Sequence, residues 1–237
     1  MRNIAIIREG FSDYCVIKHF ISAILQDDFV QLTDDNFLDM GKLTISDAVA
    51  KYFKSGGGNN LDDKKAIELK KRIIDVLYTA FKKFKREKDK VSNKDILAIN
   101  SDAEKILKDK DNYFNKEFYI LNEISQLAIE EFYNKMVKHG WAYENLPLIL
   151  PLIFFPSSEI LAASCIYDFK SESKNFRKLR AKPDLKLKVY ETDNIPRAIE
   201  TGKMEEVLSK FITPEAIEKV YKEIPEARKF IHILSCL

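Results

Sequence analysis

Short apolar runs alternate along this chain with longer stretches in which apolar residues recur at helical spacing. Residues 3–7 (NIAII) and 95–100 (DILAIN) are too short for helices and rich in β-branched side chains, so they predict two buried strands. A third apolar run, residues 146–155, contains prolines, which favours a strand of edge or irregular character. A further short strand is expected at residues 29–32 or 37–40.

Helices are predicted between these strands. Ser12 or Asp13 can cap a helix whose apolar stripe continues to Ile24, and Asp62 or Asp63 can start a long amphipathic helix. Other helices are expected near residues 46–53, 115–139, 160–167, 214–223 and 225–234, with Gly140 ending the second of these. Because strands alternate with helices, the sequence predicts an α/β fold with a mainly parallel sheet flanked by helices.

The length of 237 residues favours one domain with a small annex. We expect an α/β domain at residues 1–170, interrupted by a helical insertion at 44–90, and a loop-rich and helical extension at 171–237. No apolar run reaches the roughly 18 residues that a membrane span needs. The three cysteines are widely spaced and lack a CxxC pair, which favours a reduced, cytoplasmic protein.

The charge balance narrows the choice of partners. Lysine and arginine number 39 and aspartate and glutamate 37, and a net charge of +2 excludes a strongly basic nucleic-acid coat but not a local basic groove. Two local clusters can supply phosphate contacts, or can be ordinary solvated faces. They contain Lys82, Lys83, Lys85 and Arg86, and Lys174, Arg177, Lys178, Arg180 and Lys182.

Acidic residues stand where two of the predicted strands end. Glu9 closely follows the first strand, and Asp102 and Glu104 follow the strand at residues 95–100. Ligands of open α/β sheets bind outside the carboxyl ends of the strands. If these strands are parallel neighbours, three carboxylates meet there, and their repulsion would be relieved by a hard cation such as Mg²⁺. The alternative is that each acid is a solvated turn residue or a helix cap.

The same residues carry a resemblance to a known family. EGFSD at 9–13 resembles the E-G-x-[ST]-D opening of Toprim domains, and SDAE at 101–104 resembles their D-x-D motif with glutamate in the second acidic position. PSSEILAA at 156–163 is similar to a third element of some of these proteins. That element carries a second acidic residue and a tryptophan where this chain has Leu161 and Ala163. The resemblance covers roughly residues 3–25 and 95–165.

The resemblance implies a metal-dependent phosphoryl-transfer enzyme that acts on DNA or RNA, a nuclease of the type related to the overcoming-lysogenization-defect nucleases. Several small bacterial members of this family are tied to phage defence. By this resemblance Glu9 is a general acid, a general base or a metal ligand, and Asp102 and Glu104 bind Mg²⁺ or Mn²⁺. Asp13 and Glu159 are further candidate ligands, and for both the alternative is a role at a helix N-terminus.

A second class of function stays open. The departures at Glu104 and Leu161 also fit a non-catalytic Toprim-like interaction subunit, which would dock through its C-terminal helices to a partner such as an ATPase. The sequence contains no GxxxxGK[ST], GxSxG or GxGxxG pattern, so a P-loop, a hydrolase elbow and a dinucleotide fingerprint are excluded.

Overall fold

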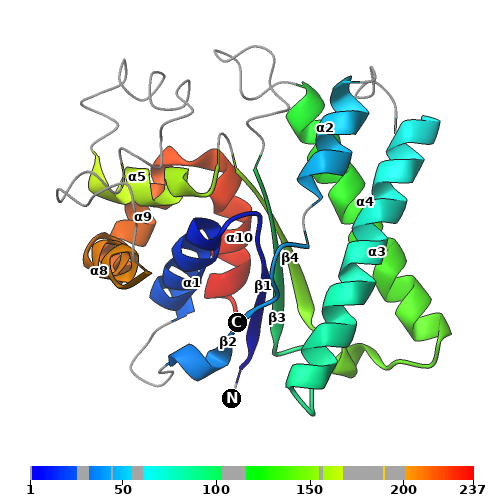
Figure 1. The fold of residues 1–237 in the computed structure, drawn as a ribbon, viewed down its shortest axis with the longest axis horizontal. Helices are drawn as coiled ribbons and strands as arrows, with labels where there is room; N and C mark the ends of the chain where they lie inside the picture. The colour runs from blue at the N-terminus through cyan, green and yellow to red at the C-terminus, as the bar shows by residue number, and fades with distance from the viewer. Residues whose placement is uncertain are drawn as a thin grey trace. The chain divides into compact units, whose positions relative to one another are not determined.

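The computed structural model describes residues 2–25, 32–43, 45–54, 61–102, 116–154, 157–167, 189 and 201–237. Its centre is a four-stranded parallel sheet in the order β2-β1-β3-β4, which confirms the predicted α/β class (Figure 1). The strands are β1 (Ile4–Ile7), β2 (Phe37–Asp39), β3 (Ile96–Asp102) and β4 (Leu148–Phe154). No helix within the described ranges is both long and apolar enough to cross a membrane.

The strand order creates a switch point between β1 and β3. From β1 the chain passes to β2 on one side, and it then returns to place β3 on the other side of β1. Both pairings are parallel and in register, so that Ile6 of β1 is level with Asp39 of β2 and with Ala98 of β3. In open α/β sheets, ligands bind in the crevice that forms at the carboxyl ends of such strands.

The described chain forms two compact units. One contains Met1–Glu9 and Asp35–Leu152, and the other contains Gly10–Asp34 and Ile153–Leu237. In this division α1 (Phe11–Leu25) belongs to the second unit, because it packs with the C-terminal helices although it directly follows the first strand. The expected domains at residues 1–170 and 171–237 stay a prediction.

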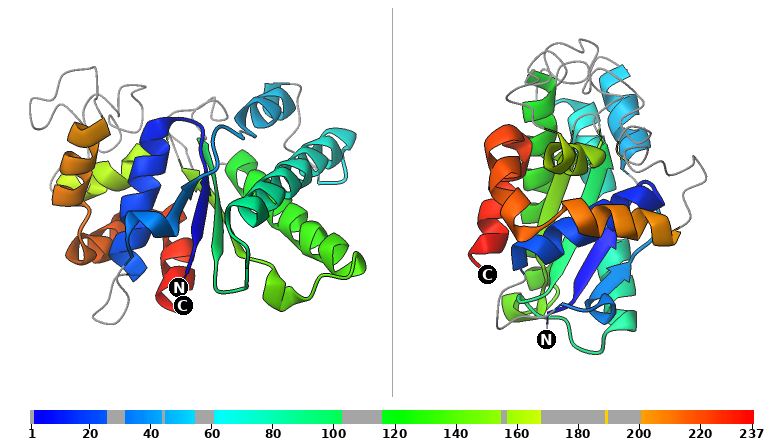
Figure 2. Two further views of the ribbon diagram at one scale, coloured as in Figure 1. Left: turned by 60° about the horizontal axis from the view of Figure 1, so that its bottom comes forward. Right: turned by 90° about the vertical axis from the view of Figure 1, so that its left-hand side faces the viewer.

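The first unit joins most of the sheet to three helices, which Figures 1 and 2 show on one side of the strands. Asp63 caps α3 by accepting a hydrogen bond from the backbone of Lys65, and the ring of Phe132 packs edge-on against Tyr78 and Phe81 of α3. Gly140 ends α4 at a φ of +85°, as expected. The helices are α2 (Ser46–Lys54), α3 (Lys64–Glu87) and α4 (Lys116–Lys138).

Buried polar side chains close the amino end of the sheet. Asp95, which is 2% exposed and precedes β3, accepts hydrogen bonds from the backbone and side chain of Asn3 and from the backbone and hydroxyl of Ser92. Asn36 is equally buried, and its amide nitrogen donates to the carbonyl of Arg2 at 2.7 Å. These side chains tie the start of β1 to the starts of its two neighbours.

The second unit is a cluster of helices around aromatic side chains. The ring of Phe230 packs edge-on against Phe20 of α1 and Phe154. Helices α9 and α10 begin at Pro214 and Pro225, as the sequence predicts, whereas α8 was not expected. The helices besides α1 are α5 (Glu159–Ile166), α8 (Thr201–Phe211), α9 (Pro214–Glu223) and α10 (Pro225–Ser235).

An ionic contact fixes α8 against α1 within this unit. Glu205 of α8 contacts the ring nitrogen Nε2 of His19, and its other oxygen lies 3.3 Å from the ammonium of Lys18. The hydrogen bond with His19 lowers the pKa of Glu205 to about 2. The carboxylate therefore stabilises the fold above its ordinary pKa, and this stabilisation is lost as the pH falls through about 2.

We predict that replacing Asp95 with alanine lowers the free energy of unfolding by roughly 3 kcal/mol, because the partly buried donors of Asn3 and Ser92 lose a buried acceptor. Urea unfolding followed by circular dichroism measures the change. Asp89→Ala, at an exposed position beyond α3, is the matched control and should change stability by less than about 0.5 kcal/mol. Equal effects of the two variants would contradict the structural role of Asp95.

We also predict that Glu205→Gln removes a pH-dependent part of the stability. At pH 7 the variant should be less stable than the wild type by about 1–2 kcal/mol, after allowance for solvent screening of a partly exposed pair. The difference should shrink as the pH is lowered from about 4.5 towards 2, because the wild-type carboxylate becomes protonated there. Urea titrations at several pH values test this, with the exposed Glu206→Gln as control.

Candidate functional site

The carboxyl ends of β1 and β3 bring together two segments that lie far apart in the sequence. The strands are parallel neighbours with Ile7 level with Ile99, so the residues that follow each strand meet at the same edge of the sheet. The hydroxyl of Ser101 lies 3.4 Å from Oε1 of Glu9, which is a long hydrogen bond. β3 continues for one more residue and ends at Asp102. The two strands whose carboxyl ends would form a shared site are therefore neighbours in the sheet.

The last residues of β3 are polar, whereas the preceding ones are apolar and fully buried. Asn100 and Ser101 are both 0% exposed. Neither side-chain atom of Asn100 has a hydrogen-bond partner among the residues that the structure describes. Sequence reasoning missed both residues, although the change from ILAI to NSD within one strand is a visible signal. It marks the point at which the strand leaves the apolar core.

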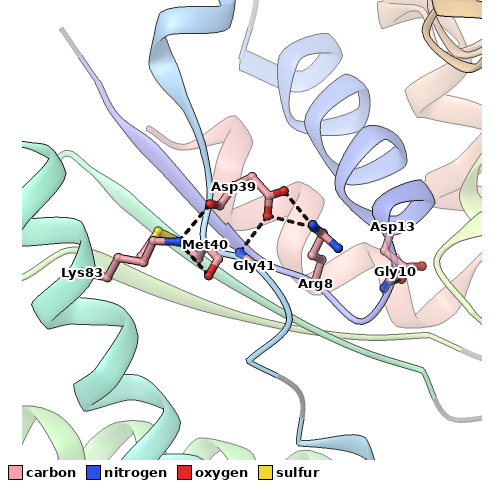
Figure 3. A network of polar contacts seen from close by, with 7 residues as sticks. All are labelled: Arg8, Gly10, Asp13, Asp39, Met40, Gly41 and Lys83. Carbon is pink, nitrogen blue, oxygen red and sulfur yellow. Dashed lines mark hydrogen bonds and ion pairs between the residues drawn. The ribbon is translucent and has the colours of Figure 1, made fainter. Parts of the chain in front are cut away.

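A second group of charges holds the carboxyl end of β2. Nε of Arg8 lies 2.8 Å from each carboxylate oxygen of Asp39, and one of these oxygens also accepts a hydrogen bond from the backbone of Gly41. The ammonium of Lys83 donates to the carbonyl oxygens of Asp39 and Met40. Figure 3 shows the two cations on opposite sides of this segment. Helix α3 is thereby fastened to the end of a strand only three residues long.

The basic residues proposed to bind nucleic acid have unlike surroundings. Lys83 is held by β2, and the ammonium of Lys85 lies 4.9 Å from the ring centroid of Trp141, a cation–π contact. Lys82 and Arg86 of the same helix are exposed. The second cluster, with Arg177, Lys178 and Arg180, lies outside the described residues, as does Glu104.

Asp13 and Glu159 belong to the second unit, where serine hydroxyls contact both. One oxygen of Asp13 accepts from the backbone of Gly10 at 2.6 Å (Figure 3), and the other accepts from Ser158 at 2.8 Å. Ser157 donates to Glu159 at 2.6 Å. Both carboxylates are fully buried. Asp13 thus serves the N-terminus of α1, as in the reciprocal half of a capping box, and also joins α1 to the start of α5.

A divalent cation suits the donor atoms at the edge of β1 and β3. Mg²⁺ takes oxygen ligands and is usually bound by one or two carboxylates while it keeps several waters. The edge offers the half-buried carboxylate of Glu9, the hydroxyl of Ser101 and the unsatisfied amide of Asn100. Within the described ranges, no three histidine, cysteine, aspartate or glutamate side chains form a group that could hold a metal ion.

Comparisons of the chain with protein-family models, curated proteins and solved structures found no match. The resemblance to Toprim domains therefore rests on the three short motifs, and membership of that family stays a prediction. The parallel sheet and the adjacency of β1 and β3 are independent of it, because they follow from the strand pairing.

We predict that Asp13→Ala lowers the free energy of unfolding by roughly 2 kcal/mol, because the buried hydroxyl of Ser158 loses its charged acceptor and the backbone of Gly10 loses its cap. Asp47→Ala is the matched control, since Asp47 is an exposed acid in the first turn of α2. Its effect should stay below about 0.5 kcal/mol. Chemical denaturation of both variants measures the contrast, and equal losses would contradict it.

Proposed function

We propose that this protein is a metal-dependent phosphoryl-transfer enzyme, a Toprim-like nuclease that acts on DNA or RNA at the carboxyl edge of β1 and β3. The supporting observation is the contact between Glu9 and Ser101, which lies at the topological switch point of the sheet and one residue from Asp102. Open α/β sheets bind their ligands at this position. The strands that lead to Glu9 and Asp102, which are about 90 residues apart in the sequence, thus end at the same edge of the sheet.

Glu9 is the central group of the proposed site. Its carboxylate is half-buried, so it remains reachable while its surroundings strengthen electrostatic interactions. The hydroxyl of Ser101 restricts the orientation of this carboxylate. In the proposal Glu9 and Asp102 hold Mg²⁺ or Mn²⁺, with Glu104 as a further ligand. The bound ion would supply charge stabilisation for an in-line displacement at phosphorus.

The first unit also carries positive charge that nucleic acid could use. Lys82 and Arg86 are exposed on α3, and the neighbouring Lys83 is fixed at the end of β2. In the proposal Lys82 and Arg86 contact backbone phosphates, which gives affinity without reading sequence. The contribution of Arg177, Lys178 and Arg180, and a role in phage defence, remain predictions from sequence.

The test is cleavage of supercoiled plasmid and of tRNA with Mg²⁺ or Mn²⁺, with wild type compared with Glu9→Gln and Asp102→Asn. We expect each variant to cleave about 100-fold more slowly or worse, because a group that binds metal or moves a proton is lost. Glu87→Gln, at an exposed position on α3, is the control and should keep wild-type activity. Equal cleavage by all four proteins would reject the assignment.

The same preparations separate the rival function. Calorimetric titration with Mn²⁺ measures metal uptake directly, and pull-down experiments measure partner binding. Absence of metal uptake together with a stable complex with an ATPase would favour the non-catalytic interaction subunit. Metal uptake that Glu9→Gln abolishes would favour the enzyme.

A further inference from the structure

The side chain of Asn100 is an anomaly in an otherwise satisfied sheet. It is 0% exposed, and both its amide nitrogen and its amide oxygen lack a hydrogen-bond partner within the described part of the chain. Buried polar groups in native proteins are nearly always paired, and an unpaired one costs stability. A second buried asparagine among the described residues of this unit, Asn36, donates to the carbonyl of Arg2. Asn100 therefore calls for a physical explanation that Asn36 does not.

The place of Asn100 in the sheet connects it with the proposed site. It is the third residue from the end of β3, and its neighbour in sequence, Ser101, reaches Glu9. The register that aligns Ile7 with Ile99 continues with Asn100 beside Arg8, the residue that precedes Glu9. Successive strand residues face opposite sides of a sheet, so Asn100 faces the side opposite to Ser101, and a ligand that binds outside the carboxyl ends of the strands lies beyond both residues.

The chemistry of the carboxamide narrows the choice of ligand. Its oxygen is a neutral hard donor, which Mg²⁺ and Mn²⁺ accept alongside carboxylates. Full burial admits only a small occupant. A neutral ligand also adds an oxygen without adding to the repulsion between negative charges. A divalent cation at the strand ends therefore suits the oxygen of this side chain.

We propose that the side-chain oxygen of Asn100 is a ligand of the divalent cation at the carboxyl edge of β1 and β3. This inference rests on the proposed function and assigns to it a residue that the acidic motifs do not include. Among the described residues the Asn100 side chain has no hydrogen-bond partner, and in the proposal the ion is that partner. Without metal, the unpaired amide lowers the stability of the fold, and with metal it adds to the affinity for the ion. Functional sites commonly show such a trade-off.

Two substitutions at Asn100 and one control test the proposal, with the melting temperature in EDTA and the Mn²⁺ affinity from calorimetry as readouts. Asn100→Leu keeps the number and branching of the side-chain heavy atoms and has no polar atoms, so it should raise the melting temperature and weaken Mn²⁺ binding at least 10-fold. Asn100→Asp should lower the melting temperature in EDTA, and Mn²⁺ should then raise it more than in wild type, with tighter binding. Asn36→Leu should lower the melting temperature and leave Mn²⁺ affinity unchanged.

The outcomes separate this inference from the proposed function. If wild type takes up no Mn²⁺, the proposed metal site and the role of Asn100 both fall. If wild type binds Mn²⁺ and Asn100→Leu binds it equally well, the role of Asn100 is overturned while the proposed function stands. Should Asn100→Leu fail to fold, Asn100→Asp decides, because tighter Mn²⁺ binding supports a ligand and equal or weaker binding overturns it.

Discussion

The parallel pairing of β1 with β3 is the interaction on which the rest of this structure depends. The four residues of β1 are fully buried and pair in register with Ile96–Ile99, although about 90 residues separate the two segments. Because the strands run in the same direction, their carboxyl ends lie level with each other. The positions of the polar groups considered for chemistry in this unit depend on that alignment. Glu9 and Ser101 come into contact only when the register of the two strands is kept.

Most regular elements could be predicted because their signals are local. The stripe of α3 repeats over 24 residues, and the starts of α9 and α10 are marked by prolines. β2 has only three residues, too few for periodicity to decide between two positions. Helix α8 follows a charged stretch without a strong capping signal. The division into units could not be read from sequence, because it depends on which distant helices α1 contacts.

The location of the candidate site could be predicted from the sequence, but the roles of the side chains around it could not. Acidic residues that follow a predicted strand can be recognised in a sequence, so Glu9 and Asp102 could be named as candidate site residues. The roles of other side chains depend on neighbours that only folding supplies. Lys83 looks like its exposed neighbour Lys82, yet it binds two backbone carbonyls. Asp13 is open to two interpretations from sequence, a helix cap or a ligand, and its oxygens accept from Gly10 and Ser158.

The two ends of β3 differ in how well their buried polar side chains are hydrogen-bonded. At its start, Asp95 satisfies several donors, and near its finish the amide of Asn100 is unsatisfied by the described residues. Substitutions at the start of β3 are therefore expected to cost stability, whereas substitutions near its finish leave these hydrogen bonds intact. Over evolutionary time, side chains at the carboxyl end of such a strand can be exchanged and so support new reactions. The hydrogen bonds at the amino end meanwhile keep the strands together.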